Sequence, residues 1–228
     1  ENLSSLDGIP WSFFDGFRSD TPSTFEYRAD KARKHLGREM SPSEIGCAKS
    51  HLAVIERFLL DDVSDWLLVI EDDVWVDVAF DFLALVHFLE ARAINYMRLY
   101  ARWMKPFDLI EFWGERQLIR YRTEPYGSQG YLINRVAAAR FLKTVTSVNT
   151  TLDIELGTFY INGLELYAIF PFPIIERAVP STLQAGRDVE RRKKPQFSLA
   201  RLSYRIQHKL LKFGANVAFR ATHRTKRL

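Results

Sequence analysis

Apolar positions near residue 40 recur at the spacing of a helix. The segment Ser41-Pro42-Ser43-Glu44 precedes them, and in it the Ser can cap a helix, the Pro suits the first turn and the Glu can close a capping box. The spacing predicts a helix from this point with a buried stripe at Ile45, Ala48, Leu52, Ile55 and Leu59. The continuous apolar run Trp66–Ile70 then predicts a strand that is covered on both faces.

The same reasoning predicts the other elements of the first 186 residues. Residues 8–34 carry turn formers and aromatic rings without a sustained period, which predicts a short strand and then a loop. Helices are expected at 77–92, at 135–145 behind a capping Asn134, and from Asp153. Strands are expected at 94–100, 117–122, 130–133 and 164–170. Because strands alternate with helices, we expect an α/β fold with a mixed, mainly parallel sheet flanked by helices.

The last part of the chain has a different pattern. Apolar residues recur there at helical spacing, at Leu199, Leu202, Ile206, Leu210, Phe213 and Val217. Basic residues fall on the opposite face, at Arg201, Arg205, Lys209 and Lys212. Residues 187–228 hold 13 basic and 2 acidic side chains, a net charge of +11, whereas residues 1–186 have a net charge of −7. We therefore expect two parts, a catalytic body at 1–186 and a basic amphipathic helical tail at 187–228.

Composition narrows the class of protein. A chain of 228 residues that is 47% hydrophobic can bury a sizeable core and is too apolar to be disordered. The single cysteine, Cys47, cannot form an intramolecular disulfide, so a reducing compartment is the simpler expectation and a Cys-rich zinc module is excluded. The apolar stretch Leu166–Ile175 is about half of the ~20 residues that a membrane span needs.

Three carboxylates follow the strand predicted at 66–70. Ligands bind at the carboxyl ends of strands in open α/β sheets, and Glu71-Asp72-Asp73 begins where that strand ends. Side chains 71 and 73 share one face of an extended chain and could hold Mg²⁺ or Mn²⁺ through oxygen ligands. Such a cation could neutralise a diphosphate. The alternative is that these acidic residues only end a strand and start a turn.

Five segments carry motifs that are specific in combination: 41–51, 71–74, 107–110, 128–135 and 152–153. Together they resemble glycosyltransferase family 25, over about residues 8–175. The family includes bacterial galactosyltransferases that extend lipopolysaccharide or lipooligosaccharide, and collagen galactosyltransferases. The resemblance implies a GT-A-like (Rossmann-like) fold. It also implies an inverting reaction that moves a sugar, most often galactose in β linkage, from a UDP-sugar to an acceptor hydroxyl with Mn²⁺ (or Mg²⁺) as cofactor.

The resemblance also implies roles for particular residues. Asp73, Glu71 and Asp72 would hold the metal ion. Asp153 is the first choice as the base that takes the acceptor proton, with Glu155 in reserve, and the alternative is that Asp153 only caps its helix. Binding of the nucleotide sugar is expected at Ser50, His51, Cys47, Gln129, Gly130 and Tyr131. For His51 the alternative is a hydrogen-bonded histidine in a helix interface, and for the segment 127–131 it is an ordinary turn.

The expected partners follow from the family and from the tail. An acceptor that is a lipid-linked oligosaccharide places the enzyme on the cytoplasmic face of the inner membrane, as a peripheral protein. A basic helix with an apolar stripe suits the anionic surface of such a membrane. Alternatively, the stripe docks on the body or on another subunit and the charges are solvated. A catalytically inactive family member that acts as a binding module, a metal-dependent phosphohydrolase and a nucleic-acid-binding protein are the rival functions, although no nucleic acid is expected.

Overall fold

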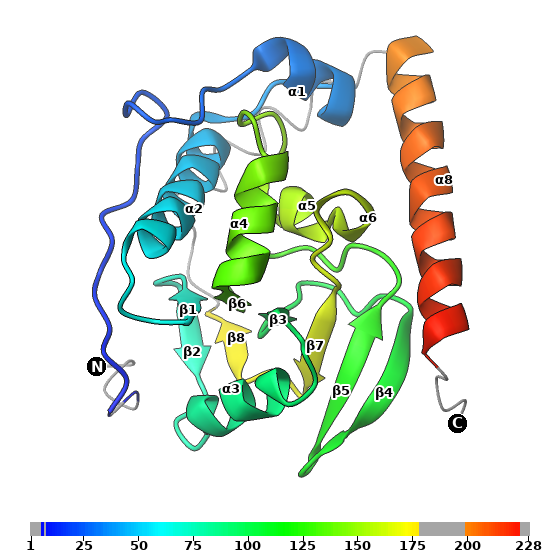
Figure 1. Ribbon diagram of the computed structural model, residues 1–228. Coiled ribbons are helices and arrows are strands. Elements are labelled where there is room, and N and C mark those ends of the chain that lie inside the picture. The colour runs from blue at the N-terminus through cyan, green and yellow to red at the C-terminus, as the bar shows by residue number, and fades with distance from the viewer. Residues whose placement is uncertain (1–5, 7, 178–198, 224–228) are drawn as a thin grey trace.

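The computed structural model describes residue 6, residues 8–177 and residues 199–223 (Figure 1). The helices are α1 (Ala29–Leu36), α2 (Pro42–Leu60), α3 (Phe82–Glu90), α4 (Arg135–Thr144), α5 (Leu152–Gly157), α6 (Phe159–Asn162) and α8 (Leu199–Thr222). The strands are β1 (Trp66–Ile70), β2 (Val74–Val76), β3 (Tyr96–Arg98), β4 (Phe107–Trp113), β5 (Arg116–Tyr121), β6 (Gly130–Asn134), β7 (Tyr167–Phe170) and β8 (Ile174–Glu176). The chain therefore has the expected α/β fold with a C-terminal helix.

The main sheet has six strands in the order β1-β6-β3-β7-β5-β4, and β2 pairs with β8 in a separate two-stranded sheet. The expectation of a mainly parallel sheet is wrong, because among the described strands only β3 and β7 pair in parallel. Alternation with helices does not fix strand direction when neighbouring strands are joined by hairpins. For example, β4 and β5 are joined by a two-residue turn in which Gly114 has a φ of +57°.

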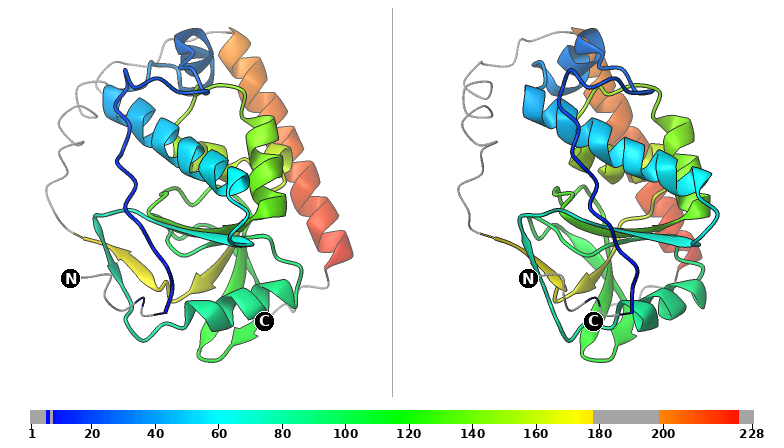
Figure 2. Two further views of the ribbon diagram at one scale, coloured as in Figure 1. Left: turned by 60° about the vertical axis from the view of Figure 1, so that its left-hand side comes forward. Right: turned by 90° about the vertical axis from the view of Figure 1, so that its left-hand side faces the viewer.

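Helices cover both faces of the main sheet. Helices α2, α4, α5 and α6 pack on one face, and α3 with the β2–β8 pair packs on the other (Figure 2). The alternation along β6 shows this division, since Tyr131 and Ile133 belong to the first core and Leu132 to the second. Strand β1 lies at the edge of the sheet, yet Leu67 packs on one core and Leu68 on the other. The prediction that this strand is covered on both faces is confirmed.

Helix α2 begins with the expected capping box. The Ser41 hydroxyl accepts a hydrogen bond from the Glu44 N–H, and the Glu44 carboxylate accepts one from the Ser41 N–H at 2.9 Å. Gly46 then allows the N-terminal segment to lie against this helix, because a Cβ there would be 2.4 Å from the Phe17 carbonyl oxygen. The short strand expected in residues 8–34 is absent from the described part of that segment, which instead contains α1. The sequence did not predict α1 because this helix has a weak apolar stripe, in which only Ala32 is buried.

The tail forms the expected helix, but the side that faces the body is the opposite of the one in the docking alternative. Its polar side faces the body: Lys212 pairs with Glu124 at 2.6 Å and Arg220 pairs with Asp108 at 3.2 Å. The apolar stripe is exposed instead, at Leu199, Leu202, Ile206, Leu210, Phe213 and Val217. The alternative that this stripe docks on the body is therefore wrong, and the acidic body binds Lys212 and Arg220 instead, while Arg205 and Lys209 are exposed.

Part of the expected tail lies outside the described residues. This part comprises the boundary at 186/187, the segment 187–198 and the last residues, 224–228. Among the described helices, none combines the length and the apolar character that a membrane span requires.

Candidate functional site

The acidic turn and the segment before β6 meet at one edge of the sheet. Strands β1 and β6 are antiparallel with Ile70 opposite Gly130, so the end of one lies beside the start of the other. The Glu71 N–H donates to the Gln129 carbonyl at 3.0 Å, and the Ser128 hydroxyl donates to a Glu71 carboxylate oxygen at 2.6 Å. Two segments that the sequence marked separately, 71–73 and 127–131, therefore form one site.

His51 stands behind Glu71 and is buried. Its Nε2 lies 3.4 Å from the Glu71 carboxylate, and its Nδ1 is hydrogen-bonded to the Tyr131 hydroxyl at 3.0 Å. Burial acts to lower the pKa of His51, but its contacts with Tyr131, Cys47 and Glu71 outweigh burial and raise that pKa well above the ordinary value. The imidazole is hydrogen-bonded between α2 and strand β6 and also contacts Glu71, and its role in nucleotide-sugar binding stays a prediction.

Cys47 lies one turn before His51 on α2. The Cys47 sulfur, a ring nitrogen of His51 and a carboxylate oxygen of Glu71 all lie within 4.8 Å of one another. This donor set could hold a soft metal ion such as Zn²⁺. In the described structure, however, both His51 nitrogens already face Tyr131 and Glu71, which favours the oxygen-rich side of Glu71 as the place for a cation.

Asp73 has the features that suit a carboxylate ligand of a cation. It is half-buried, and its Oδ1 is buried without a hydrogen-bond partner among the described residues. Burial raises the pKa of Asp73, and the negative charges of Glu71, Glu176 and Asp72 raise it further. Oxygen ligands with excess negative charge fit Mg²⁺ or Mn²⁺. Of the three consecutive acidic residues, Asp72 is the exposed one.

Three side chains that the sequence reasoning missed complete this acidic site. The Glu176 carboxylate, at the end of β8, accepts hydrogen bonds from the Tyr100 hydroxyl and from Arg102, both at 2.7 Å. Gln129 also reaches Glu176, at 3.4 Å. A signal for these residues exists: Glu176 ends an apolar run and Arg102 follows one, as Glu71 does. Arg102 places a positive charge at the site. Burial acts to lower the pKa of its guanidinium, but Glu176 above all, with Tyr100 and Asp153, raises that pKa above the ordinary value.

The turn at Tyr126 and Gly127 joins Asp153 to the acidic site. Both turn residues have a left-handed φ, +62° and +84°. A Cβ on Gly127 would be 2.5 Å from the Tyr100 ring, so only glycine fits there. The buried Arg98 guanidinium donates to the carbonyls of both turn residues and fixes the turn. The Gly127 N–H in turn donates to Asp153 Oδ2 at 3.3 Å. The N-cap of α5 is Thr151, so Asp153 is not the capping residue of its helix.

The remaining predicted residues lie beneath or beside the site. Tyr131, Gln129 and Gly130 are buried, and a Cβ on Gly130 would be 2.3 Å from the Ile174 side chain. The Ser50 hydroxyl donates to the Gly46 carbonyl at 2.8 Å and accepts from the Phe17 N–H at 2.7 Å. These groups hold the shape of the site.

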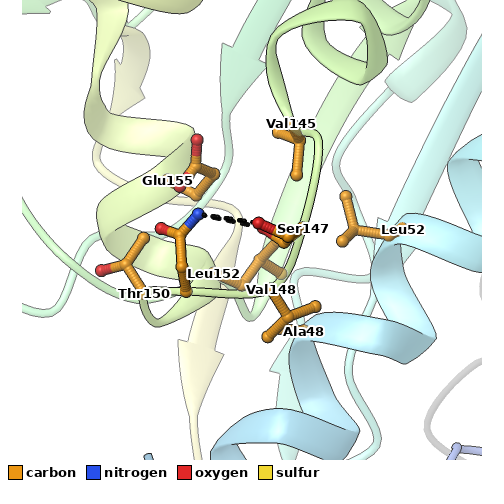
Figure 3. A pocket seen from close by; sticks show the side chains of 9 residues that line it. Ala48, Leu52, Val145, Ser147, Val148, Thr150, Leu152 and Glu155 are labelled. Carbon is orange, nitrogen blue, oxygen red and sulfur yellow. Dashed lines mark hydrogen bonds between the residues drawn. The ribbon is translucent and has the colours of Figure 1, made fainter. Parts of the chain in front are cut away.

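Glu155 lies apart from the other acidic residues. It lines a small, mostly apolar pocket with Ala48, Leu52 and Val145 (Figure 3). Asp153 on the same helix instead contacts the turn at Gly127. Burial alone raises the pKa of Glu155 from 4.5 to about 7. The structure therefore separates the two candidate bases.

The substitution Glu155→Gln is expected to stabilise the protein at pH 8. Between pH 4.5 and 7 the folded state keeps a proton on Glu155 that the unfolded state releases, so wild-type stability falls as pH rises. At about 1.4 kcal/mol per pKa unit the loss is about 3 kcal/mol, which the neutral amide avoids. Thermal unfolding of both proteins should show a Tm difference of roughly 6–12 °C at pH 8 that shrinks toward pH 4.5. A difference that does not depend on pH would contradict this account.

Comparison with known proteins shows the family of the chain. A family model described as "Glycosyltransferase family 25 (LPS biosynthesis protein)" matches residues 1–156, which is more than half of the chain. No curated protein matches the chain. The match includes the acidic turn, the segment 127–131 and Asp153, and it ends before Glu176. The chain therefore belongs to glycosyltransferase family 25, a family of lipopolysaccharide biosynthesis.

Proposed function

We propose that the protein is an inverting glycosyltransferase that moves galactose in β linkage from a UDP-sugar to a lipid-linked saccharide. The buried Asp73 Oδ1, which has no hydrogen-bond partner among the described residues, is the observation that carries this proposal. Asp73 and Glu71, with the exposed Asp72 beside them, would hold Mn²⁺ or Mg²⁺. A bound cation there supplies Lewis-acid stabilisation of the leaving diphosphate.

The side chains around the acidic turn orient the proposed ligands. Ser128 and His51 both contact Glu71 and restrict its carboxylate to one position. Arg102 offers a positive charge beside the carboxylates, in reach of a phosphate group. Gln129, Gly130 and Tyr131 support the nucleotide-sugar site from below, and Cys47 and Ser50 border it on α2.

Asp153 is the proposed base. An inverting displacement needs a carboxylate that takes the acceptor proton on the face opposite the leaving group. Asp153 Oδ2 is held by the Gly127 N–H on the turn that precedes Ser128, so it stands beside the proposed donor site without belonging to the metal ligands. Its other oxygen accepts from the Ile154 N–H at 3.0 Å.

Residues 1–186 are proposed to be a GT-A-like catalytic domain, and residues 187–228 a tail that rests on an anionic membrane surface at the cytoplasmic face of the inner membrane. The support for the membrane is the exposed stripe of α8, where Leu199 is 76% and Phe213 is 70% exposed. Exposed basic residues, Arg205 and Lys209, border this stripe. A helix of this kind buries its apolar side in the headgroup region and gains attraction from acidic lipids.

The double substitution Leu210→Ser/Phe213→Ser should weaken binding to vesicles that contain phosphatidylglycerol. Each side chain loses its burial in lipid, which is worth about 1.5–3 kcal/mol, so the bound fraction in a pelleting assay should fall at least tenfold. The matched control is Leu60→Ser/Val63→Ser, which changes two exposed apolar side chains away from α8. Equal pelleting of all three proteins would rule out the membrane contact.

Thermal stabilisation by UDP tests the proposed function. A ligand that binds only the native state must raise its apparent stability, by about 2.7 kcal/mol at a concentration of one hundred times Kd. We expect UDP to raise Tm in the presence of Mn²⁺ and much less in its absence, and UDP-galactose to do so more than other UDP-sugars. Transfer of galactose to a saccharide acceptor would then be measured directly. No shift with any UDP-sugar would favour the inactive binding module instead.

A further inference from the structure

We propose that the groove between α8 and the body binds an anionic saccharide, and that this saccharide is the acceptor of the reaction. This inference rests on the proposed function. The groove, called the α8 groove below, has a volume of about 320 Å³ and is lined from the body by Tyr126, Tyr160 and Ile154 and from the helix by Tyr204, Arg205 and Lys209. A volume of this size suits a short saccharide.

Aromatic rings form one wall of the α8 groove. The Tyr204 ring stacks on His35 of α1 with centroids 4.3 Å apart, and the His208 ring lies 3.8 Å from Tyr204. The Tyr160 hydroxyl is hydrogen-bonded to His208 Nδ1 at 3.0 Å. These contacts fix the rings before any ligand arrives. Because His35 and His208 cover the Tyr204 ring, this wall offers ring edges and the Tyr204 hydroxyl group, which suit the hydroxyl groups of a sugar.

The charge of the α8 groove is positive. Arg205 and Lys209 make no hydrogen bond or ion pair with any residue that the structure describes. Lys212 is paired with Glu124, the acidic residue of the groove lining, at 2.6 Å, and the two charges cancel. Burial lowers the pKa of both His35 and His208, with nearby cations adding to that shift, so neither imidazole carries the charge at neutral pH. Two cations therefore remain for a phosphate or carboxylate on the ligand.

The α8 groove leads to the proposed base. Tyr126 lines the groove and is 37% exposed, and it is also the first residue of the turn that holds Asp153. Asp153 does not line the groove itself, but its Oδ2 accepts from the N–H of Gly127, the residue after Tyr126, at 3.3 Å, and its neighbour Ile154 does line it. Ile154 and Thr158, from α5 and its C-terminal end, line the groove as well. A saccharide in the groove would thus present one end toward Asp153 and the other toward α8.

The experiment measures binding of three probes to the full chain by calorimetric titration: lactose 1-phosphate, lactose and inorganic phosphate. We expect lactose 1-phosphate to bind at least tenfold more tightly than either of the others, because it alone engages the rings and the cations together. In the variant Arg205→Gln/Lys209→Gln, its affinity should fall roughly tenfold, and the affinity for lactose should not change. The matched control Arg57→Gln/Lys143→Gln removes one Arg and one Lys that are exposed outside the groove and should bind as the wild type does.

Two results would overturn the inference. Equal affinity of lactose 1-phosphate for the wild type and for Arg205→Gln/Lys209→Gln would show that the α8 groove does not bind it. Inorganic phosphate that binds as tightly as lactose 1-phosphate would show a simple anion site. Stabilisation by UDP and Mn²⁺ separates this failure from failure of the proposed function. It should be unchanged in the groove variant; its absence from the wild type would refute the proposed function and with it the role of the saccharide as acceptor, whereas the titrations alone decide whether the groove binds the saccharide.

Discussion

Replacing Asp73 with Asn should abolish metal-dependent sugar transfer and leave the protein folded. The substitution removes a carboxylate whose Oδ1 is buried without a hydrogen-bond partner among the described residues. Burial and three neighbouring acidic residues raise the pKa of this carboxylate. The proposed cation would lose one of its anionic ligands, and stabilisation of the leaving diphosphate would fall with it. We expect turnover to fall by at least 10²–10³-fold.

The same variant should be at least as stable as the wild type when no metal is added, because an amide does not repel Glu71 and Glu176. Transfer rates with and without Mn²⁺ and the Tm of both proteins measure the two effects. Asp62→Asn is the matched control, since Asp62 is an exposed carboxylate away from the site. Full activity of Asp73→Asn would remove the metal-site proposal, and loss of the folded state would require the test to be repeated with Asp73→Glu.

Replacing Asp153 with Asn should lower kcat by roughly 10²–10⁴-fold, the usual contribution of a general base. The amide can still accept the hydrogen bond from the Gly127 N–H, so the turn and the neighbouring donor site should keep their geometry. The KM for the UDP-sugar and the Tm shift with UDP and Mn²⁺ should therefore change little. A variant with normal kcat and raised KM would show that Asp153 contributes to binding and not to proton transfer.

Glu155→Gln provides the decisive comparison, because Glu155 was the reserve base. Asp153 and Glu155 are two residues apart on a helix, so their side chains are separated by about 200° of rotation. Glu155 lies in the apolar pocket beside Leu52. If Asp153 is the base, Glu155→Gln should keep most of the wild-type turnover. Loss of turnover in Glu155→Gln with normal turnover in Asp153→Asn would transfer the role to Glu155.

Much of the fold could be predicted from local patterns. The capping box at Ser41, the strand Trp66–Ile70 and the helix behind Asn134 are all confirmed, because each depends on short-range hydrogen bonds or on a continuous apolar run. Strand direction was predicted wrongly. Direction depends on which strands become neighbours, and β6, which lies between β1 and β3 and opposes both, is far from them in the sequence.

The candidate site was found from the sequence only in part. Glu71 and Asp73 follow a buried strand directly, which is a local signal. Arg102 and Glu176 also follow apolar runs, but the pairing of β2 with β8 and the course of the chain after β3 bring them to the same place, and this long-range arrangement cannot be read from the runs themselves. Asp153 was chosen by resemblance to the family, and its role as base stays a prediction; the structure shows its contact with Gly127.

The orientation of α8 could not be read from its amphipathic pattern. Such a pattern shows that a helix has two different sides, but not which side faces the body. The orientation of α8 depends on specific partners. Asn216 accepts a hydrogen bond from Arg120 at 2.5 Å and donates one to the Arg122 carbonyl at 2.9 Å, and Lys212 pairs with Glu124 of the acidic body. The opposite charges of the two parts were visible in the sequence and would have favoured this orientation.

Because α8 presents its apolar stripe outward and lines the α8 groove with its inner side, this one helix sets the height of the groove above any lipid surface on which it rests. That height is about one helix diameter, roughly 10 Å. A sugar close to the lipid end of an acceptor could reach Tyr126 and Asp153 at this height, whereas a sugar many residues farther out would extend past them. The thickness of the helix would then select acceptors by the distance of the reacting hydroxyl group from the membrane.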